Sequence, residues 1–540
     1  MRKAIVLLLL APFCLPARAE KVRTTVIRPG VTLVQTIIGA DEPGGPEMIH
    51  CLLVNPRQRG VRLEAGLGGD TVEEAGGGME AVTKLVARTG ALAGVNADFF
   101  PFTGDPLGLE IHQGVIVSEP AGGPAALGIL KGGRLVMGRP GWRATVSSAD
   151  GAAFALAGVN REFGRGELGL FAPVYGEKTP AAPATIVALD APKAALRSGK
   201  PITGKVTKIS DETGAVANAT DGFLLSGTDA AAEFLKAHAQ PGQTVTIRAD
   251  VVEDGVPWSE VREAVGGRPI LLRDGREDMR LAEEHVAQDF STTRHPRTAV
   301  GVQKDGTVML VAVDGRQILS RGMSLPELTA WLKSHGAVDA INLDGGGSTC
   351  LSVAGLAVNC PSDGIVRRVA DSLLVFGDAK ALRPAKRVIQ HDAQRVTAGA
   401  AGVTAAATST TPAIWGTDNA GAFADQGGDI YGYKGGTAEV VRRALNGSAE
   451  DRWPVEVLPG PAGKMLLAWK DGALRVTIRD VNNNPVAGQE IEIETPDGRR
   501  GEVATGKDGS AIVPASLVPD EKAGATLVSG PLTKKWPEAK

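Results

Sequence analysis

The chain has 540 residues, of which 43% are hydrophobic, 22% charged and 4% aromatic. At roughly 150 residues per domain this length predicts three or four domains, and the composition, with Gly 70 and Pro 33, excludes a mostly disordered, collagen-like or coiled-coil chain. The formal charge of −3 gives no reason to expect nucleic acid as a partner.

The first twenty residues predict a cleaved export signal. Arg2 and Lys3 precede an apolar run over residues 4–15, and Ala17-Arg18-Ala19 has the small-x-small form of a signal-peptidase site. The run is short for a bilayer span and polar sequence follows it. We therefore expect residues 1–19 to be removed and the rest to be periplasmic or extracellular, with no transmembrane segment.

Residues 25–378 are expected to form one α+β catalytic domain, with mixed β-sheets and flanking helices. Its strand candidates are short apolar runs at residues 129–130, 135–137, 308–313, 340–343 and 372–376. Helices are predicted where apolar residues recur every three or four positions, over residues 79–86 before Gly90 and over residues 229–239. A third helix is predicted to begin at the capping box Ser324–Glu327 and to end at Gly336.

Two smaller all-β (Ig-like) modules are expected to follow. Residues 379–465 combine a linker rich in Ala, Thr, Gly and Pro with short strand candidates between glycine turns. Over residues 466–540 apolar residues alternate with polar ones, as at Leu474, Val476 and Ile478. This alternation predicts an Ig-like or transthyretin-like β-sandwich, in which no catalytic constellation is visible.

Three cysteines remain beyond the export signal, Cys51, Cys350 and Cys360. In an oxidising compartment an odd number permits one bridge and one spare thiol. Cys350 and Cys360 are close in sequence and are the expected pair. Three buried thiols are the alternative.

The stretch over residues 340–349 is the most informative for chemistry. An apolar strand ends on Asp344 and is followed by Gly345, Gly346, Gly347 and Ser348. Glycines allow the backbone to approach a ligand closely and to expose consecutive N–H groups that cradle an anion. The segment is no P-loop, because no lysine follows the glycines. The alternative is an ordinary glycine-rich turn that Asp344 caps.

Several arginines flank predicted strand ends and are expected to converge on this loop. A guanidinium group suits phosphate because it donates two parallel hydrogen bonds and stays charged. Asp314 ends the strand at residues 308–313, as Asp344 ends its own strand. Each arginine, taken alone, has the alternative of being a solvated surface charge. The set comprises Arg297, Arg316, Arg321, Arg367 and Arg368.

A second polar cluster is predicted around Asn96 and Asp98. One residue separates them, so on an extended backbone both point to the same face. Phe99 and Phe100 follow, and desolvation by aromatic rings raises the pKa of a carboxyl, as a general acid requires. The alternative is a strand end with Asp98 capping a turn. Further titratable candidates are Glu110, His112 and His295, for which structural roles are the alternative.

These motifs together resemble the phosphodiester glycosidase family. The resemblance extends over about residues 25–378 and is most specific over residues 297–376. It also takes in Ala264–Pro269, which is similar to the family's Gly-Gly-x-Pro element. The other segments that carry it, in family order, are Asn96–Phe100, Arg297–Gly301, Asp314–Arg316, Arg321–Gly322, Asn342–Ser348 and Arg367–Val369.

The resemblance implies hydrolysis of a sugar-1-phosphodiester, releasing the free sugar and leaving a phosphomonoester on the other partner. Breaking the C–O bond on the sugar side develops oxocarbenium character, which a nearby carboxylate stabilises. Asp344 or Asp314 is expected to act at the anomeric carbon or on water, and Asn96 and Asp98 to bind the sugar, with Asp98 also a catalytic candidate. The phosphate clamp is expected to comprise Arg297, Arg316 and Arg321, completed by residues 345–348.

No cofactor is required by this chemistry, although Asp98, Asp314 and Asp344 leave open a bound Ca²⁺ or Mg²⁺. The expected partner is a carbohydrate phosphodiester of the envelope or of an extracellular glycan; the oligomeric state is not indicated. Two other functions remain open. One is a non-catalytic envelope protein that binds anionic polysaccharide, and the other is a phosphodiesterase that cuts the P–O bond.

Overall fold

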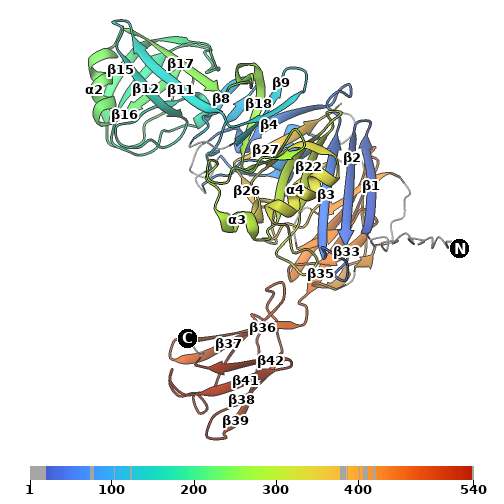
Figure 1. The fold of residues 1–540 in the computed structure, drawn as a ribbon. Helices are drawn as coiled ribbons and strands as arrows, with labels where there is room; N and C mark the ends of the chain where they lie inside the picture. The colour runs from blue at the N-terminus through green and yellow to red at the C-terminus, as the bar shows by residue number, and fades with distance from the viewer. Residues whose placement is uncertain are drawn as a thin grey trace, which may run out of the picture.

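The computed structural model describes residues 20–72, 78–101, 104–121, 125–377, 385, 387–400, 402–405, 411–417 and 421–537. The predicted export signal therefore lies outside the described residues. Figure 1 shows a central body, a barrel beside it and a separate C-terminal module beyond it. Within the described ranges, no helix combines the length and apolarity that crossing a membrane requires.

The first of two large sheets in the central body has eight strands. Its central strands are buried, as in β22, where all six residues are buried. β21 pairs with β22 and β23 on either side, both antiparallel. The strand order is β1 (Glu20–Arg28), β2 (Val31–Ile38), β3 (Glu47–Val54), β22 (Val308–Val313), β21 (Arg297–Gln303), β23 (Ala337–Asn342), β19 (Ile270–Arg273) and β20 (Arg276–Glu277).

The second large sheet has ten strands and extends into the middle module. One bridge, between Ala357 and Thr417, joins the module's strands to the rest of the sheet. The order is β28 (Val388–Gln390), β35 (Glu450–Leu458), β34 (Gly436–Ala444), β31 (Ala413–Thr417), β25 (Leu356–Ala357), β24 (Leu351–Val353), β6 (Ala93–Asn96), β27 (Asp371–Phe376) and β4 (Arg62–Leu67), with β29 (Gln394–Thr397) beside β35. The two large sheets share one apolar core, which includes Leu52 and Val300 from the first and Val95 and Leu373 from the second.

A five-stranded sheet connects the central body to a closed barrel. Its order is β10 (Leu135–Gly138), β9 (Ala125–Leu130), β18 (Val261–Gly267), β7 (Glu110–His112) and β8 (Val115–Ser118). The barrel order is β11 (Gly141–Ser148), β12 (Ala153–Val159), β13 (Leu168–Phe171), β16 (Phe223–Gly227), β14 (Ala184–Asp190), β15 (Ile202–Glu212) and β17 (Thr244–Val252). The long pairing of β11 with β17 closes it.

The three predicted helices form where expected. They are α1 (Val82–Thr89), which ends at the left-handed Gly90, α2 (Asp229–His238), and α4 (Leu325–Ser334), which begins with the Ser324 capping box. The described residues contain one further α-helix, α3 (Gln288–Thr292). The strand candidates at residues 129–130, 135–137, 308–313 and 372–376 lie within β9, β10, β22 and β27, and the candidate at residues 340–343 falls on β23.

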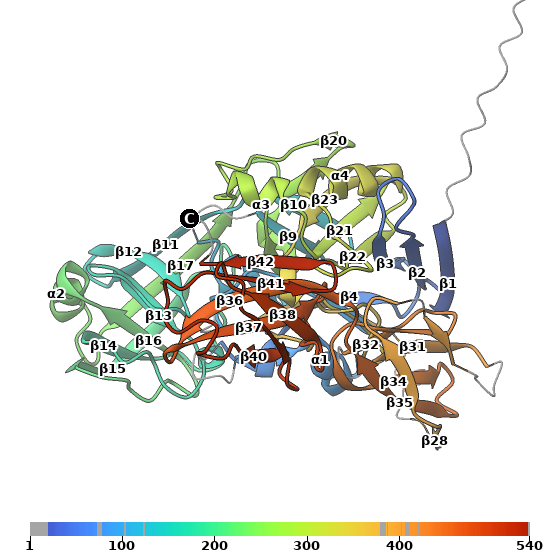
Figure 2. The ribbon, with the colours of Figure 1, turned by 90° about the horizontal axis from the view of Figure 1, so that it is seen from below.

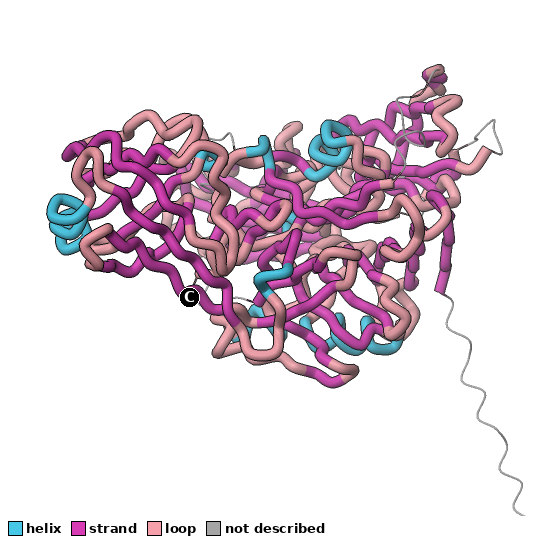
Figure 3. Tube along the Cα trace, turned by 90° about the horizontal axis from the view of Figure 1, so that it is seen from above, coloured by secondary structure: helices cyan, strands magenta, loops and turns pink. Residues whose placement is uncertain are grey.

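The expected α+β class with flanking helices is wrong, because the chain is mostly β. Figure 3 shows strands throughout the molecule and only short helical segments. The physical reason is that the sheets are covered mainly by other sheets, whose apolar faces pack against each other. The barrel, which the sequence did not indicate, supplies much of the additional strand content.

The C-terminal module is all β, as expected. One sheet comprises β36 (Ala462–Lys470), β37 (Ala473–Asp480) and β40 (Ser510–Ile512), and the other comprises β39 (Arg500–Ala504), β38 (Glu490–Glu494), β41 (Ala525–Ser529) and β42 (Leu532–Trp536). Figure 2 shows this module from below, in front of the central body. Two small pairings remain: β5 (Glu80–Ala81) with β26 (Arg368–Val369), and β30 (Val403–Thr404), β33 (Asp429–Gly432) and β32 (Ala422–Ala424).

The expected bridge between Cys350 and Cys360 is not formed. Both residues and Cys51 are buried free thiols, which was the alternative. Cys350 packs beside α1, whereas Cys360 packs with Met48 and Phe423 in a different apolar cluster. Burial raises the pKa of the Cys51 and Cys350 thiols to about 12, so none of this points to a reactive cysteine.

Candidate functional site: an acid–arginine cluster

The ends of β23 and β6 bring Asp344 and Asp98 together. The Asp344 amide donates to the Ala97 carbonyl at 2.8 Å. Asn96 Nδ2 donates to the Asp344 carbonyl oxygen at 2.6 Å. These bonds tie the two large sheets together at the point where both carboxyl groups emerge.

The surroundings of Asp344 shift the pKa of its carboxyl group. Burial raises its pKa to about 6, while hydrogen bonds from Ser348 and the Gly345 amide and the charges of Arg367 and Arg316 act in the opposite direction. The Gly345 amide donates to Asp344 Oδ1 at 2.8 Å. A group with such a pKa changes protonation state near neutral pH, as acid–base catalysis requires.

Asp98 is more deeply buried and is exposed by only 2%. Burial raises its pKa to about 7, and the negative charge of Asp344 adds to the rise. Its carboxyl accepts hydrogen bonds from the amides of Phe99, at 2.7 Å, and Gly108. Gly266, from β18, lacks the Cβ that would collide with this carboxyl, so this glycine makes room for Asp98.

The glycine loop does not present the expected row of free N–H groups. The Gly345 amide binds Asp344, the Gly346 amide donates to the Pro296 carbonyl at 2.9 Å, and the Ser348 amide donates to the Gly345 carbonyl at 3.2 Å. Of the four amides, that of Gly347 alone has no partner among the described residues. Most of the expected cradle is therefore used within the protein.

The glycines instead clear space for two arginines. Gly346 has φ 61°, and a Cβ there would lie 3.1 Å from Arg316 Nη2. A Cβ on Gly347 would collide with the guanidinium of Arg367 and the carboxyl of Asp363. Arg316 itself has φ 60°, a conformation that a non-glycine residue adopts only when the surrounding structure holds it there.

Arg297 supplies a buried positive charge beside Arg316. Its side chain donates to the carbonyls of Met323, Phe290 and Thr293 at 2.8, 2.7 and 2.8 Å, and its Nη1 is buried without a partner among the described residues. Burial and then the charge of Arg316 lower the pKa of Arg297 to about 10. Two neighbouring guanidinium groups that repel each other favour an anion between them.

Aromatic rings form a wall next to these cations. Arg297 Cζ lies 4.5 Å from the centre of the Phe290 ring, and Arg268 Cζ lies 5.1 Å from that of Phe99. Phe290 contacts Phe99 edge to face at 6.1 Å and stacks on His295. We name Asp98, Asp344, Arg297, Arg316 and Arg367 the acid–arginine cluster.

His295 belongs beside the cluster. Its Nδ1 lies 3.2 Å from Arg316 Nη2. Burial and then the charges of Arg297 and Arg316 lower the pKa of His295. The neutral ring accepts a hydrogen bond from Arg316 and thereby orients that guanidinium.

Asn96 is fully engaged in holding the site together. Its Oδ1 accepts from Thr298 Oγ1 at 2.8 Å and from the Cys350 amide at 3.1 Å. Its amide nitrogen donates to Asp344, and the residue is only 1% exposed, so the side chain is not accessible to a sugar. We assign Asn96 a positioning role in place of the expected sugar contact.

Asp314 is not brought to Asp344. Its Oδ2 lies 2.9 Å from His50 Nε2, and its Oδ1 accepts from Asn359 Nδ2 and the Cys360 amide, both at 2.9 Å. The residue is only 1% exposed. It therefore braces the loop before Cys360 instead of facing the acid–arginine cluster.

The side chains of two of the expected arginines are bound elsewhere. The Arg321 guanidinium donates to the Gly45 carbonyl, and its amide donates to the Pro46 carbonyl at 3.1 Å. Arg368 Nε donates to the Met79 carbonyl at 2.9 Å. Arg297, Arg316 and Arg367 are thus the arginines that the structure brings together.

Two buried acids, Asp371 and Glu110, lie next to Asp98. Glu110 was a candidate from the sequence, whereas Asp371 was not. Asp371, the first residue of β27, accepts the Asp98 amide at 2.8 Å and forms a hydrogen bond with the carboxyl of Glu110. Burial first, and then the neighbouring acids, raise the pKa of Asp371 and Glu110 well above the ordinary range. Burial and mutual repulsion therefore favour the protonated form of one of these two carboxyls. His112 lies against Glu110 at 2.5 Å.

The expected metal ligands do not form a set. In the part of the chain that the structure describes, no group of three or more His, Cys, Asp or Glu residues is placed to hold a metal ion. Asp314 is committed to His50, Asn359 and Cys360, and Asp98 to backbone amides. The residues present therefore do not fit a shared Ca²⁺ or Mg²⁺ ion.

Comparison with known proteins finds a similarity to one family. The family model for phosphodiester glycosidases matches residues 193–376. The predicted resemblance is thereby confirmed for this part of the chain, and the matched segment, which is similar to phosphodiester glycosidases, includes Arg297, Arg316, Asp344 and Arg367. Asp98 and the first strands lie before this match, although the resemblance was expected from residue 25.

Two curated relatives share short segments with the chain. A protein of Bacillus subtilis, prophage-derived and uncharacterized, is 42% identical over 105 residues, which is 19% of this chain and 16% of that protein. N-acetylglucosamine-1-phosphodiester alpha-N-acetylglucosaminidase of Mus musculus is 40% identical over 74 residues, 14% of each chain. The matches thus span about a sixth or less of the relatives' length.

Two solved structures share the fold. A protein from Synechocystis has a TM-score of 0.56 at 22% identity, covering 66% of this chain and 64% of that one. A protein from Burkholderia pseudomallei has a TM-score of 0.53 at 26% identity, covering 63% of this chain and 75% of that one. The mostly β architecture is therefore found in other proteins.

Proposed function

We propose that the protein is a hydrolase that cleaves the glycosidic C–O bond of a sugar-1-phosphodiester and releases the free sugar. One observation carries the proposal. The buried Nη1 of Arg297 has no partner among the described residues and lies in a group of cations that also adjoins the tuned carboxyl of Asp344. An anion held by arginines next to an acid is what this reaction requires.

The arginines take the phosphate. Arg316 is exposed and reaches Asp344 electrostatically, so its guanidinium group is accessible to a ligand. Arg367 also reaches Asp344 electrostatically, but its guanidinium donates to Asp363 at 2.6 Å and to Ser348 Oγ at 3.3 Å, so it contributes positive charge from a fixed position. Arg297 is fully buried and provides a fixed positive charge behind them. A diester carries one negative charge and the product monoester carries nearly two, so this clamp stabilises the leaving group as charge develops on it.

Asp344 and Asp98 act on the bond at the anomeric carbon of the sugar. Water adds to the anomeric carbon as the bond from that carbon to the phosphate oxygen breaks. The sugar keeps the oxygen of water, Asp344 accepts the proton, and the other product leaves as a phosphomonoester. Asp98, protonated below about pH 7, provides a proton to the departing oxygen, and proton exchange with solvent restores both acids.

We further propose that the protein is exported and acts on an envelope or extracellular glycan. The charged start, apolar run and small-x-small site at residues 1–19 support export. The mouse relative's name describes an N-acetylglucosamine-1-phosphodiester as its substrate, which supports the diester chemistry.

A substrate screen tests the proposal. The full chain is incubated with UDP-sugars and with aryl and methyl sugar-1-phosphodiesters, and free sugar and phosphomonoester are quantified. The expected result is equal release of both products, lost in Asp344→Asn. Failure to hydrolyse any diester, together with measurable binding of anionic glycan, contradicts the proposal and supports a binding protein.

A further inference from the structure

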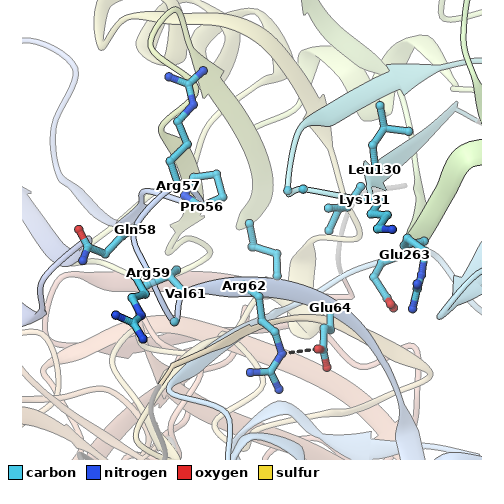
Figure 4. Close-up of a pocket in the computed structure, with 16 residues that line it drawn as sticks. Pro56, Arg57, Gln58, Arg59, Val61, Arg62, Glu64, Leu130, Lys131 and Glu263 are labelled. Atoms are coloured by element: carbon cyan, nitrogen blue, oxygen red, sulfur yellow. Dashed lines mark hydrogen bonds and ion pairs between the residues drawn. The ribbon is translucent and has the colours of Figure 1, made fainter.

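A second concave site lies in the central body, away from the acid–arginine cluster. A cavity of about 460 Å³ opens between the loop that leads into β4 and the turn that joins β9 to β10. In Figure 4, Arg57, Arg59 and Arg62 lie along one side of it, and Leu130 and Lys131 lie across from them. We name this cavity the basic groove.

The basic groove and Asp98 lie at opposite ends of the paired strands β4 and β27. β4 pairs with β27 so that Arg62 faces Phe376, whereas Leu67 faces Asp371. Asp371 is the residue that accepts the Asp98 amide. Five residues of strand separate the two positions, which is about 17 Å at the rise of an antiparallel strand. The groove is therefore no extension of the proposed catalytic site.

Unneutralised positive charge lines the groove. Arg59, Lys131 and Arg262 are exposed and make no ion pair with any described residue. Arg57 is also exposed and lies within electrostatic reach of Asp305, across the rim. The whole chain has a formal charge of −3, whereas this cavity is lined by a concentration of positive charges.

The acids of the groove do not cancel these cations. Glu64 is paired with Arg62. Glu263 is only 7% exposed and accepts hydrogen bonds from the Gln113 amide at 3.0 Å and the Ala65 amide at 3.4 Å. Both acids thus have partners of their own, and the exposed cations remain available to a ligand.

The lining indicates the chemistry of the ligand. The described residues around the cavity include no aromatic ring on which a nucleic-acid base would stack. Val61, Leu63 and Ile129 provide an apolar floor beneath the cations. Spaced cations above a smooth floor suit a chain that carries regularly spaced phosphates on short polyol or sugar units.

We propose that the basic groove binds a phosphate-bearing stretch of the same glycan polymer whose end is hydrolysed at the acid–arginine cluster. This inference rests on the proposed function for the identity of the polymer. Binding at a second point on one molecule raises the effective concentration of its end at the catalytic site. A long substrate is thereby favoured over a free sugar phosphate.

Binding of a defined polyanion tests the groove without using turnover. The full chain is titrated with a poly(glycerol phosphate) oligomer of about ten units in an isothermal calorimeter. The double variant Arg59→Gln/Lys131→Gln is expected to bind it at least about fivefold more weakly, since each exposed ion pair contributes up to about 1 kcal/mol. The control variant Lys205→Gln/Lys464→Gln removes two exposed lysines elsewhere and is expected to bind as the wild type does.

Each outcome of this titration supports or overturns binding of the polyanion at the basic groove. Weaker binding by the groove variant alone supports the groove, whether or not the wild type hydrolyses a small diester, so the failure of the proposed function remains distinguishable. Equal binding by the groove and control variants overturns the groove. So does a loss of binding in Arg316→Gln that the groove variant does not show, and so does tighter binding of single-stranded DNA of equal charge.

Discussion

Asp98 and Asp344 lie close enough for the charge of one to act on the other. Burial and then the charge of Asp344 raise the pKa of Asp98 to about 7, while the pKa of Asp344 is raised to about 6. Because the pKa of Asp344 is the lower of the two, Asp344 can be ionised while Asp98 is still protonated.

Asp344→Asn is expected to lower kcat by at least about a thousandfold, because the amide cannot accept a proton or stabilise positive charge at the anomeric carbon. Its oxygen still accepts the Gly345 amide, so the melting temperature is expected to change little. Release of free sugar from an aryl sugar-1-phosphodiester measures the effect. Asp339→Asn, on the same strand, is the control and is expected to retain full activity. More than a tenth of wild-type activity in Asp344→Asn removes that residue from catalysis.

The rate is expected to depend on pH as a bell. Asp344, with its pKa raised to about 6, must be ionised, so kcat/KM falls as the pH drops below 6. Asp98, with its pKa raised to about 7, must be protonated, so kcat/KM falls as the pH rises above 7. Initial rates between pH 4.5 and 9 test this. In Asp98→Asn the alkaline fall is expected to vanish at a lower overall rate; an unchanged alkaline fall assigns it to another group.

Gly346→Ala is expected to raise KM for the diester about tenfold, because a Cβ 3.1 Å from Arg316 Nη2 displaces that guanidinium from the phosphate. Gly472→Ala is the matched control. Gly472 has φ 75° but open space around it, so its variant carries the backbone strain without the collision. Both variants are expected to lose similar stability, and only the first to change KM. Equal KM values would falsify the role of Arg316.

The C-terminal module is expected to position Arg316. Asn482 Oδ1 accepts the Ile318 amide at 3.0 Å, two residues from Arg316, and the Asn482 side chain is buried. Loss of this hydrogen bond in Asn482→Ala is expected to raise KM about three- to tenfold with little change in kcat. Asn446→Ala removes a similar bond in an exposed turn and is expected to leave KM unchanged. A KM equal to that of wild type in Asn482→Ala contradicts the contact's role.

Glu110→Gln is expected to stabilise the protein at alkaline pH. The pKa of Glu110 is raised in the folded state, mainly by burial, so the protonated group contributes its full stability below pH 4 and loses it as the pH rises through the folded value. The neutral amide avoids that loss, and the melting temperature at pH 8 is expected to rise by about 2–4 °C. Glu260→Gln, on the surface, serves as control. A fall in melting temperature at pH 8 contradicts the assignment.

Local signals predicted local structure well. The Ser324 capping box and the left-handed Gly90 are complete within one helical turn, and both formed as expected. The barrel could not be predicted in the same way, because its closure pairs Gly141 with Val252, more than a hundred residues apart. The alternation of apolar and polar residues along one strand does not indicate which distant strand pairs with it.

The site shows the same limit. Asp98, Asp344 and Arg297 were visible as charged residues at strand ends, where side chains emerge from a sheet. The role of the glycines was not, because whether a bare backbone faces a phosphate or an arginine depends on Arg316 and Arg367, which arrive from other loops. Asp371 was missed since it opens an apolar strand, and nothing in its neighbours marks a carboxyl that contacts Glu110.

Hydrolysis in ¹⁸O-labelled water tests the central claim most directly. The wild-type chain cleaves a sugar-1-phosphodiester in labelled water, and both products are analysed by mass spectrometry. Attack at the anomeric carbon, as proposed for the site around Asp344, places the label in the hydroxyl group of the released sugar. Label found in the phosphomonoester instead shows attack at phosphorus, and the protein is then a phosphodiesterase.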